Sequence, residues 1–309
     1  MKYKDWLKEW LENYVAPAVK ARTYNQYVEI SKNRIIPCFG ECEIEDVTPL
    51  IVQRYITELM KNGNLKSGEG LSSNSINSII TVIQSSMERA YVMGVISEYT
   101  MNRLKRPRMQ ERKIECFTTT EQKIIEQAVQ RDKRNKMKGV ILCLYTGLRI
   151  GELLALEWED IDLNRGEITV NKTCHDGKNE KGEYCRLVDT PKTATSHRVV
   201  PLPKQLIPFL KEWKKARQTT YVVEAHGRAI SVRSYQSSFS IMLKNNKIPH
   251  RGFHALRHTF ATRALECGMD VKSLSEILGH KSPTVTLKRY AHSMMDHKKM
   301  LMNRLGKLF

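Results

Sequence analysis

The chain has 309 residues, 41% of them hydrophobic, which is enough for two average domains with buried cores. Its 51 lysines and arginines against 33 aspartates and glutamates give a formal charge of +18, so nucleic acid is the first candidate partner. The absence of any apolar run of about 18 residues argues against a membrane span, and the charged N-terminus does not resemble a secretory signal. The seven cysteines, an odd number, do not fit a disulfide framework, so we expect a cytoplasmic protein.

Residues 1–104 carry helical patterns almost throughout. The first apolar stripe with a 3.6-residue period consists of Trp6, Leu7, Trp10, Leu11 and Tyr14. A second periodic segment, around Tyr24 and Ile30, is expected to end at Pro37 and Gly40.

Two further helices complete this region. Thr48 and Pro49 match an N-cap followed by proline at the first helical position, and that helix is expected to run to about Gly63. A longer helix, marked by isoleucines from Ile76 onward, is expected to end near Gly94. Four helices predict a compact domain over residues 1–104.

Residues 105–114 read as a basic linker between two domains. The run KRPRMQERK contains five basic residues, a proline and no apolar periodicity. Such a strip is either solvated or lies along DNA phosphates, in which case Lys105, Arg106 and Arg108 are the candidate contacts.

The second domain is expected over residues 115–309, again with helices. Thr118 and Glu121 have the spacing of a capping box, and an apolar helix is expected from about Lys136 to Tyr145, ending at Gly147. Short strands at residues 168–170, 186–188 and 198–200, with a polar loop at residues 175–185, predict one small antiparallel sheet embedded in helices. Helical periodicity returns from Pro203 onward. The predicted fold class is therefore mainly α with a small antiparallel β-sheet.

Several familiar sites are missing from the sequence. It contains no G-x-x-x-x-G-K-[ST], G-x-G-x-x-G or H-E-x-x-H, the usual signals of nucleotide hydrolysis, dinucleotide binding and zinc proteolysis. Cys174, His175 and Cys185 flank the polar loop, but one such pair without a second is poor spacing for zinc. We therefore expect no metal and no cofactor.

The residues whose side chains could take part in catalysis are far apart along the chain. His254 and Arg257 stand three residues apart on a predicted helix, so an imidazole and a guanidinium share one face. With Arg149 from another segment, two guanidinium groups can grip the non-bridging oxygens of one phosphodiester without a metal.

A tyrosine and a lysine can supply the remaining chemistry. Tyr290 as a phenolate is a competent nucleophile, and a phosphotyrosine preserves the energy of the phosphodiester, so no ATP is required. Lys192 lies in a predicted hairpin, where it can protonate the leaving 5′ oxygen as a general acid.

Together these residues resemble the tyrosine recombinase (phage integrase) family. The ordered set is Arg149, Lys192, His254-x-x-Arg257, Leu-Gly-His280 and then Tyr290. The segments Thr-Gly-Leu-Arg-x-x-Glu-Leu and His-x-Leu-Arg-His-Thr-x-Ala-Thr carry the likeness over about residues 115–295, and residues 1–105 resemble the family's SAM-like core-binding domain more loosely.

The resemblance implies a role for each matching position. Tyr290 would form a 3′-phosphotyrosine, Arg149 and Arg257 would hold the phosphate, and Lys192 would protonate the leaving oxygen. His254 and His280 would hydrogen-bond the phosphate and assist proton transfer, and Glu152 would orient the arginine cluster. Lys172 and Lys178 flank the same hairpin and stay open as alternatives for the general acid.

The resemblance also implies partners and architecture. We expect a two-domain clamp around double-stranded DNA recombination sites, a homotetramer on two sites and accessory DNA-bending or directionality factors. It would act at the bacterial nucleoid as a mobile-element integrase, either with these two domains alone or as part of a longer chain. The apolar stripe around Met300 and Leu301 would dock on a neighbouring protomer or on its own domain. A non-catalytic DNA-binding regulator and a type IB topoisomerase are the alternative functions.

Overall fold

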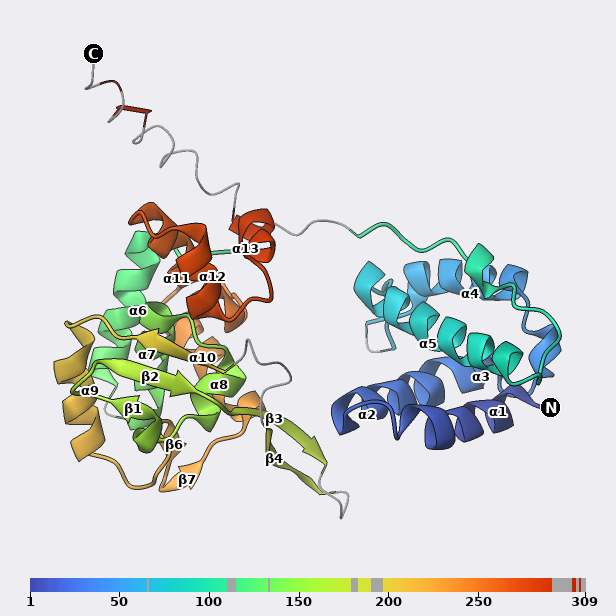
Figure 1. Cartoon of the computed structure of the whole chain (residues 1–309), viewed down its shortest axis with the longest axis horizontal. Helices are drawn as coiled ribbons and strands as arrows, with labels where there is room; N and C mark the ends of the chain where they lie inside the picture. Colours follow the sequence, from blue (N-terminus) through green and yellow to red (C-terminus); the bar gives the residue numbers. More distant parts are fainter. Residues whose placement is uncertain are drawn as a thin grey trace. The chain divides into compact units, whose positions relative to one another are not determined.

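The chain folds into two compact units, Met1–Arg112 and Lys113–Phe309, in a computed structural model (Figure 1). The structure describes residues 1–65, 67–109, 115–132, 134–178, 183–189, 197–290, 302–303 and 306. Lys192 with its hairpin, and most of the stripe around Met300 and Leu301, lie outside the described residues.

The first unit is a helical domain. Its helices are α1 (Tyr3–Trp10), α2 (Ala21–Ile30), α3 (Ile36–Phe39), α4 (Pro49–Asn62) and α5 (Ser73–Val92). The apolar stripe expected on α1 is confirmed, because Trp6, Leu7 and Trp10 are buried in one core with α5 isoleucines. The indole nitrogen of Trp6 donates to the carbonyl of Ser86 at 2.9 Å, which ties α1 to α5.

The second periodic segment ends at Gly40, as expected, but Pro37 does not interrupt it. π-helical turns at Leu11–Val15 and Ser31–Ile35 extend α1 and α2, and the chain continues helically through α3 to Phe39. Pro37 stands in the first turn of α3, a position where its fixed φ fits a helix and the missing N–H is tolerated. Its place after the π turn explains why it does not break the helix.

The beginning of the basic segment is held against the first unit. The side chain of Gln53 on α4 accepts from the backbone N–H of Lys105 at 2.9 Å. The guanidinium of Arg106 donates to Gln84 at 2.6 Å and to Thr81 at 3.3 Å, both on α5. Lys105, Arg106 and Arg108 are all exposed. This part of the segment is thus fixed to its own unit while its charges face solvent.

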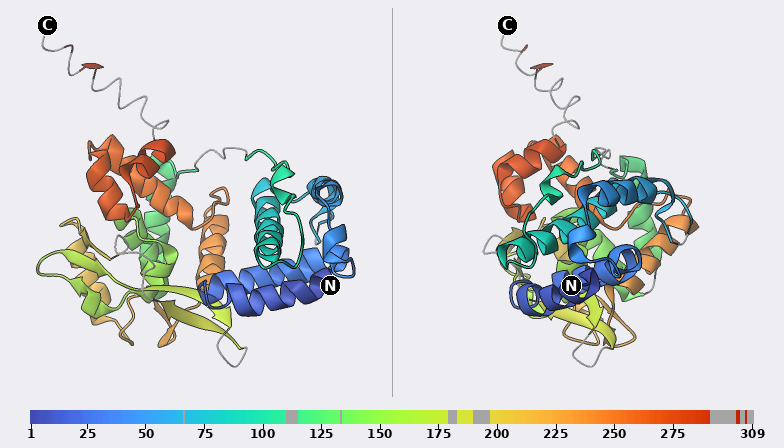
Figure 2. Two further views of the ribbon diagram at one scale, coloured as in Figure 1. Left: turned by 45° about the vertical axis from the view of Figure 1, so that its right-hand side comes forward. Right: turned by 90° about the vertical axis from the view of Figure 1, so that its right-hand side faces the viewer.

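The second unit is also mainly helical. Its helices are α6 (Thr119–Arg131), α7 (Lys138–Thr146), α8 (Ile150–Ala155), α9 (Leu206–Lys215), α10 (Val232–Asn245), α11 (His254–Glu266), α12 (Val271–Leu278) and α13 (Pro283–Tyr290). The predicted capping box opens α6, where Thr118 and Glu121 each bind the other's backbone N–H. Helices α11, α12 and α13 gather at one end of the unit, and α11 packs on α7 (Figures 1 and 2).

The strands form three small antiparallel sheets in the described part of the chain, where one was expected. They are β1 (Ile161–Asp162), β2 (Glu167–Val170), β3 (Thr173–Lys178), β4 (Tyr184–Asp189), β5 (Arg198–Pro201), β6 (Glu224–Ala225) and β7 (Arg228–Ala229). Their order is β1-β2-β5, β3-β4 and β6-β7. Fold class is thus mainly α with small antiparallel sheets.

The polar residues expected as a loop belong partly to β3. His175 pairs with Leu187 of β4, and Lys178 pairs with Tyr184. The far ends of β3 and β4 extend away from the helices of their unit (Figures 1 and 2). Cys174 of β3 lies in the core, but the residues of β4 are half-buried or exposed, so the arm lacks the alternation of buried and exposed positions by which strands are recognised.

No helix in the described ranges combines the length and the apolar character that crossing a membrane requires.

Candidate active site

Two helix ends and one buried arginine form the centre of the site. The guanidinium of Arg257, on α11, is 2% exposed and donates to the carbonyl of Gly147 at 2.7 Å and to that of Leu278 at 2.6 Å. Gly147 ends α7, and Leu278 is the last residue of α12. Arg257 therefore joins the C-terminal ends of two helices that are far apart in the sequence.

The glycines in the two motifs have a structural reason. Gly147 and Gly279 are the C-caps of α7 and α12, with φ of 66° and 62°, a left-handed conformation that residues with a Cβ rarely adopt. A Cβ on Gly147 would also lie 2.5 Å from the ring of Phe260. These glycines turn the chain so that the carbonyls at both helix ends reach the arginines.

Arg149 reaches the same place from the start of α8. It donates to the carbonyl of Gly279 at 3.1 Å and to the carboxylate of Glu152 at 2.6 Å. Since Arg257 holds the adjacent carbonyl of Leu278, the two guanidinium groups meet at one end of α12. Arg149 retains 37% of its side-chain exposure, so its charge is accessible from solvent.

Glu152 and Arg198 form a buried ion pair beneath Arg149. Both oxygens of the Glu152 carboxylate accept from Arg198, at 3.1 and 2.9 Å, and the Arg198 Nε donates to the carbonyl of Ile277 at 2.6 Å. Burial by itself raises the pKa of Glu152, but the hydrogen bonds and charge of Arg198, together with the charge of Arg149, lower that pKa to about 2. The carboxylate is therefore ionised at neutral pH.

Arg198 is not among the residues that the sequence predicts for the site. The signal was present, because Arg198 and Val200 are the buried positions of β5 while Val199 and Pro201 are exposed. An arginine on the core-facing side of an alternating strand requires a buried acid, and Glu152 is that acid.

We expect Glu152→Gln to destabilise the second unit strongly. It leaves Arg198 buried without a counter-charge, which typically costs about 3–5 kcal/mol and corresponds to a melting temperature lower by roughly 10 °C. Because the folded pKa of Glu152 lies below its usual value, its ionised carboxylate stabilises the folded state fully above pH ~4.5. This stabilisation is lost as the pH falls towards 2. Calorimetry of the full chain between pH 3 and 7 measures both effects.

The matched control for that experiment is Glu159→Gln, since the Glu159 side chain is 78% exposed. We expect its melting curve to follow the wild type. A Glu152→Gln protein that melted within about 1 °C of the wild type would show that the buried pair does not support the site.

The two arginines favour an anion between them. Burial, and after it the charge of Arg149, lowers the pKa of Arg257 to about 9. The group is still charged at neutral pH, but burial and the repulsion from Arg149 make that charge costly to hold. A bound phosphate would relieve the repulsion between the like charges. The arrangement can therefore stabilise the extra negative charge of a pentavalent phosphorus.

The histidines and the tyrosine come from α11, from the turn between α12 and α13, and from α13. His280 follows the Gly279 cap, and its Nδ1 lies 2.7 Å from the hydroxyl of Thr286 on α13. His254 is exposed at the first position of α11, where its ring lies edge-to-face against that of His258. The Nδ1 of His258 is 2.7 Å from the hydroxyl oxygen of Tyr290.

Tyr290 is 1% exposed. Its ring belongs to a small apolar cluster formed with residues of α11 and α12, including Ala261, Leu265 and Leu274. Leu278 belongs to the same cluster, and its carbonyl accepts from Arg257.

The candidate lysines lie in different surroundings. Lys192 is outside the described residues. The ammonium group of Lys172 binds the carboxylate of Glu157 and lies 3.6 Å from those of Glu159 and Asp160. These acids hold Lys172 and raise its pKa, chiefly through the hydrogen bond to Glu157. Lys178 ends β3.

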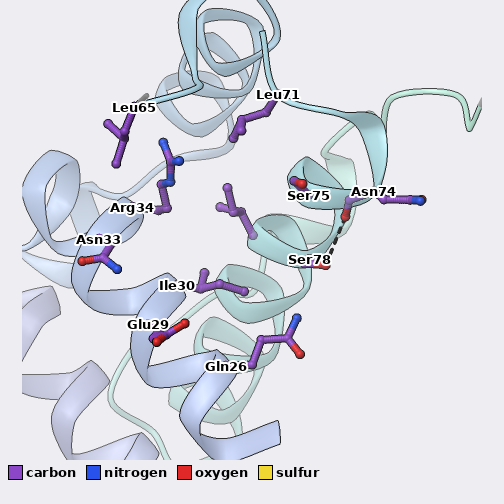
Figure 3. A pocket seen from close by; sticks show the side chains of 11 residues that line it. Gln26, Glu29, Ile30, Asn33, Arg34, Leu65, Leu71, Asn74, Ser75 and Ser78 are labelled. Atoms are coloured by element: carbon purple, nitrogen blue, oxygen red, sulfur yellow. Dashed lines mark hydrogen bonds between the residues drawn. The ribbon is translucent and has the colours of Figure 1, made fainter. Parts of the chain in front are cut away.

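The residues that the structure describes form no metal site at this centre. Among the described residues, no three histidine, cysteine, aspartate or glutamate side chains gather closely enough to hold a metal ion. A pocket of about 420 Å³ lies instead in the first unit, between α2 with its π turn and α5 (Figure 3). Gln26, Asn33, Arg34, Asn74 and Ser78 line it, and it contains none of the candidate catalytic residues.

Two family models match the sequence. The phage integrase family model matches residues 110–297, which is more than half of the chain. The chain belongs to the phage integrase family. A second model, for the family's N-terminal SAM-like domain, matches residues 2–60 in the first unit, so the looser likeness there is confirmed as well.

Named relatives agree with the family. A tyrosine recombinase XerC-like protein of Caldanaerobacter subterraneus subsp. tengcongensis is 29% identical, over 99% of this chain and 83% of the relative. The ICEBs1 integrase of Bacillus subtilis is 25% identical, over 94% of this chain and 78% of the relative. The chain is accordingly a tyrosine recombinase, a site-specific recombinase of the mobile-element type.

Solved structures share the fold. The Tn1549 transposon integrase in complex with a circular intermediate DNA has a TM-score of 0.77 at 22% identity, over 99% of each chain. A lambda integrase tetramer bound to a Holliday junction has a TM-score of 0.69 at 19% identity, over 92% of this chain and 79% of the other. At these identities the likeness establishes a helical domain followed by the recombinase catalytic domain.

Proposed function

We propose that this recombinase cuts and rejoins DNA through a transient 3′-phosphotyrosine on Tyr290, without a metal ion or ATP. The observation that carries the proposal is the convergence of Arg149 and Arg257 on adjacent carbonyls at the end of α12. Tyr290 stands at the end of the next helix and packs against the same two helices, α11 and α12. In this proposal, a nucleophile and two phosphate-binding cations act at one place.

Each proposed role follows from the chemistry of the group. Arg149 and Arg257 would hold the two non-bridging oxygens of the scissile phosphate. The Glu152 carboxylate would orient Arg149, and Arg198 would hold the same carboxylate as its buried counter-ion.

The remaining groups would act at the edge of the phosphate. His254 and His280 would donate to its oxygens, and His280 is oriented by Thr286. Lys192 remains the proposed general acid, because Lys172 is already engaged by Glu157 and its neighbours. Protonating the 5′ oxygen as it leaves completes a metal-free displacement.

The proposed partner is double-stranded DNA, held by both domains, with boundaries at 1–104, 105–114 and 115–309. Lys105, Arg106 and Arg108 are exposed, as phosphate contacts must be. The solved integrase structures contain DNA, and one is a tetramer on a Holliday junction. We propose that this chain likewise forms a homotetramer on two sites, assisted by DNA-bending or directionality factors at the bacterial nucleoid in the cytoplasm.

The test is a search for a covalent DNA adduct. The probes are duplex fragments that tile the DNA on both sides of the encoding gene, incubated with the full chain in EDTA and separated in SDS. We expect one fragment to remain attached to the protein, and mass spectrometry to place the nucleotide on the peptide containing Tyr290. A nicked duplex built on that fragment then traps the adduct for rate measurements.

Other results would assign the chain differently. Cleavage that EDTA abolishes, or attachment through another residue, contradicts the proposal. Specific binding without any adduct indicates a regulator. Relaxation of supercoiled plasmids without products from paired sites indicates a type IB topoisomerase.

A further inference from the structure

The hydroxyl of Tyr290 lies against a histidine to which the proposed function gives no role. His258 Nδ1 and Tyr290 Oη are 2.7 Å apart, and the ring centroids are 5.7 Å apart with a tilt of 60°. In the Nε2–H tautomer of neutral His258, which our inference uses, the phenol of Tyr290 donates and Nδ1 accepts.

The surroundings of His258 hold its ring in place. His258 follows Arg257 on α11, and Arg257 is anchored to carbonyls at the ends of α7 and α12. One helical turn earlier, the ring of His254 lies edge-to-face against it, with centroids 4.6 Å apart and an angle of 86°. Nδ1 is therefore presented to Tyr290 from the same rigid helix that binds the phosphate.

The nucleophile needs a proton acceptor of this kind. With a usual pKa of about 10, a phenol is almost fully protonated at neutral pH and attacks weakly. Proton transfer to a positioned imidazole typically contributes about 10²–10⁴-fold to a rate. Arg257 is charged at neutral pH and cannot accept the proton, whereas the Nδ1 of His258 lies within hydrogen-bond distance of the Tyr290 hydroxyl.

We propose that His258 is a catalytic residue that takes the proton of Tyr290 during strand cleavage, an inference that rests on the proposed function above. The O–H bond of Tyr290 breaks, the bond from its oxygen to phosphorus forms, and the bond from phosphorus to the 5′ oxygen breaks. The phenol proton goes to Nδ1 of His258, and the 5′ oxygen takes a proton from Lys192. On rejoining, the protonated His258 returns its proton to the departing phenolate.

The decisive variant is His258→Asn. An asparagine oxygen takes a position close to that of Nδ1, so it retains a hydrogen-bond acceptor for Tyr290 but cannot remove the proton. We expect cleavage of the nicked duplex to fall about 100-fold, with DNA binding in gel shifts within about threefold of the wild type. The matched control is His250→Asn in the exposed segment before α11, which should cleave at the wild-type rate.

Two further measurements distinguish proton transfer from a structural effect. In His258→Ala, added imidazole should restore part of the cleavage rate, which an effect on folding or packing does not predict. A duplex with sulfur in place of the bridging 5′ oxygen has a leaving group that needs no protonation. This substrate should rescue Lys192→Ala but not His258→Asn, because the two residues act on opposite sides of the phosphorus.

The possible outcomes distinguish a failure of this inference from a failure of the proposed function. If the wild type forms a Tyr290 adduct and His258→Asn cleaves equally fast, His258 only contacts the tyrosine and the inference is wrong while the recombinase mechanism stands. Rescue of His258→Asn by the sulfur substrate, or failure of imidazole to restore His258→Ala, also overturns it. If the wild type forms no adduct, the proposed function fails and the inference with it.

Discussion

Tyr290→Phe is expected to abolish the covalent DNA adduct while leaving the fold and DNA binding intact. The phenylalanine ring keeps its place in the cluster with Ala261, Leu265 and Leu274, and only the hydroxyl near His258 is lost. Losing one such hydrogen bond costs about 1 kcal/mol, too little to unfold the unit. Removing the nucleophile should lower cleavage by roughly 10⁴-fold or more, because no other group in the proposed mechanism can form the intermediate.

The chain offers a closely matched control for this substitution. Tyr235 is also fully buried, and its hydroxyl donates to the carbonyl of Lys136 at 2.9 Å. Tyr235→Phe therefore loses one hydrogen bond from a buried phenol, as Tyr290→Phe does, but away from the arginines. Wild-type cleavage is expected from the control. An adduct that persisted in Tyr290→Phe would mean that another residue is the nucleophile.

The second large effect is expected from the arginines. Arg257→Ala and Arg149→Ala should each reduce cleavage by at least about 100-fold, roughly 3 kcal/mol, while largely retaining DNA binding. The reason is that the negative charge they stabilise develops at the phosphorus during the reaction and is smaller in bound DNA. Cleavage rates on the nicked duplex, compared with gel-shift affinities, distinguish a loss of transition-state stabilisation from a loss of DNA binding.

The two arginine variants are expected to differ in melting temperature. Arg257→Ala leaves the carbonyls of Gly147 and Leu278 without their donor in a buried place, so its melting temperature should also fall. Arg149 is partly exposed, and Arg149→Ala should melt closer to the wild type. Arg251→Ala, which breaks a pair with Glu121 elsewhere in the unit, is the control for losing an arginine. A wild-type cleavage rate in either site variant would disprove its role.

The motif glycines show why the sequence was informative about this site. Gly147 and Gly279 stand next to the residues that form the site, because a left-handed cap is needed where a helix ends and its carbonyls turn towards an arginine. The capping box at Thr118 and Glu121 is another signal of this local kind. Such signals depend on neighbouring residues and are readable before any tertiary structure is known.

The features that the sequence did not predict depend instead on contacts beyond the immediate neighbours in the chain. Pro37 did not interrupt its helix, which ended at Gly40 as expected, because a π turn precedes it. Residues 175–178 formed a strand although the partner strand β4 shows no alternation of buried and exposed positions. Arg198 pairs with Glu152, which precedes it by 46 residues, and His258 meets Tyr290 across 32 residues. No periodicity in the chain relates such positions.

By itself, the sequence determined the recombinase family and the mainly helical class. It also predicted the described candidates for the site, which are Arg149, Glu152, His254, Arg257, His280 and Tyr290. Only the tertiary structure decided that Arg198 pairs with the buried Glu152, that Thr286 contacts His280 and that His258 contacts Tyr290. The physical reason is that a motif records the backbone turns and side chains of one segment. The partners of the charged groups in a buried site come from other segments of the chain, and only the tertiary structure brings these segments together.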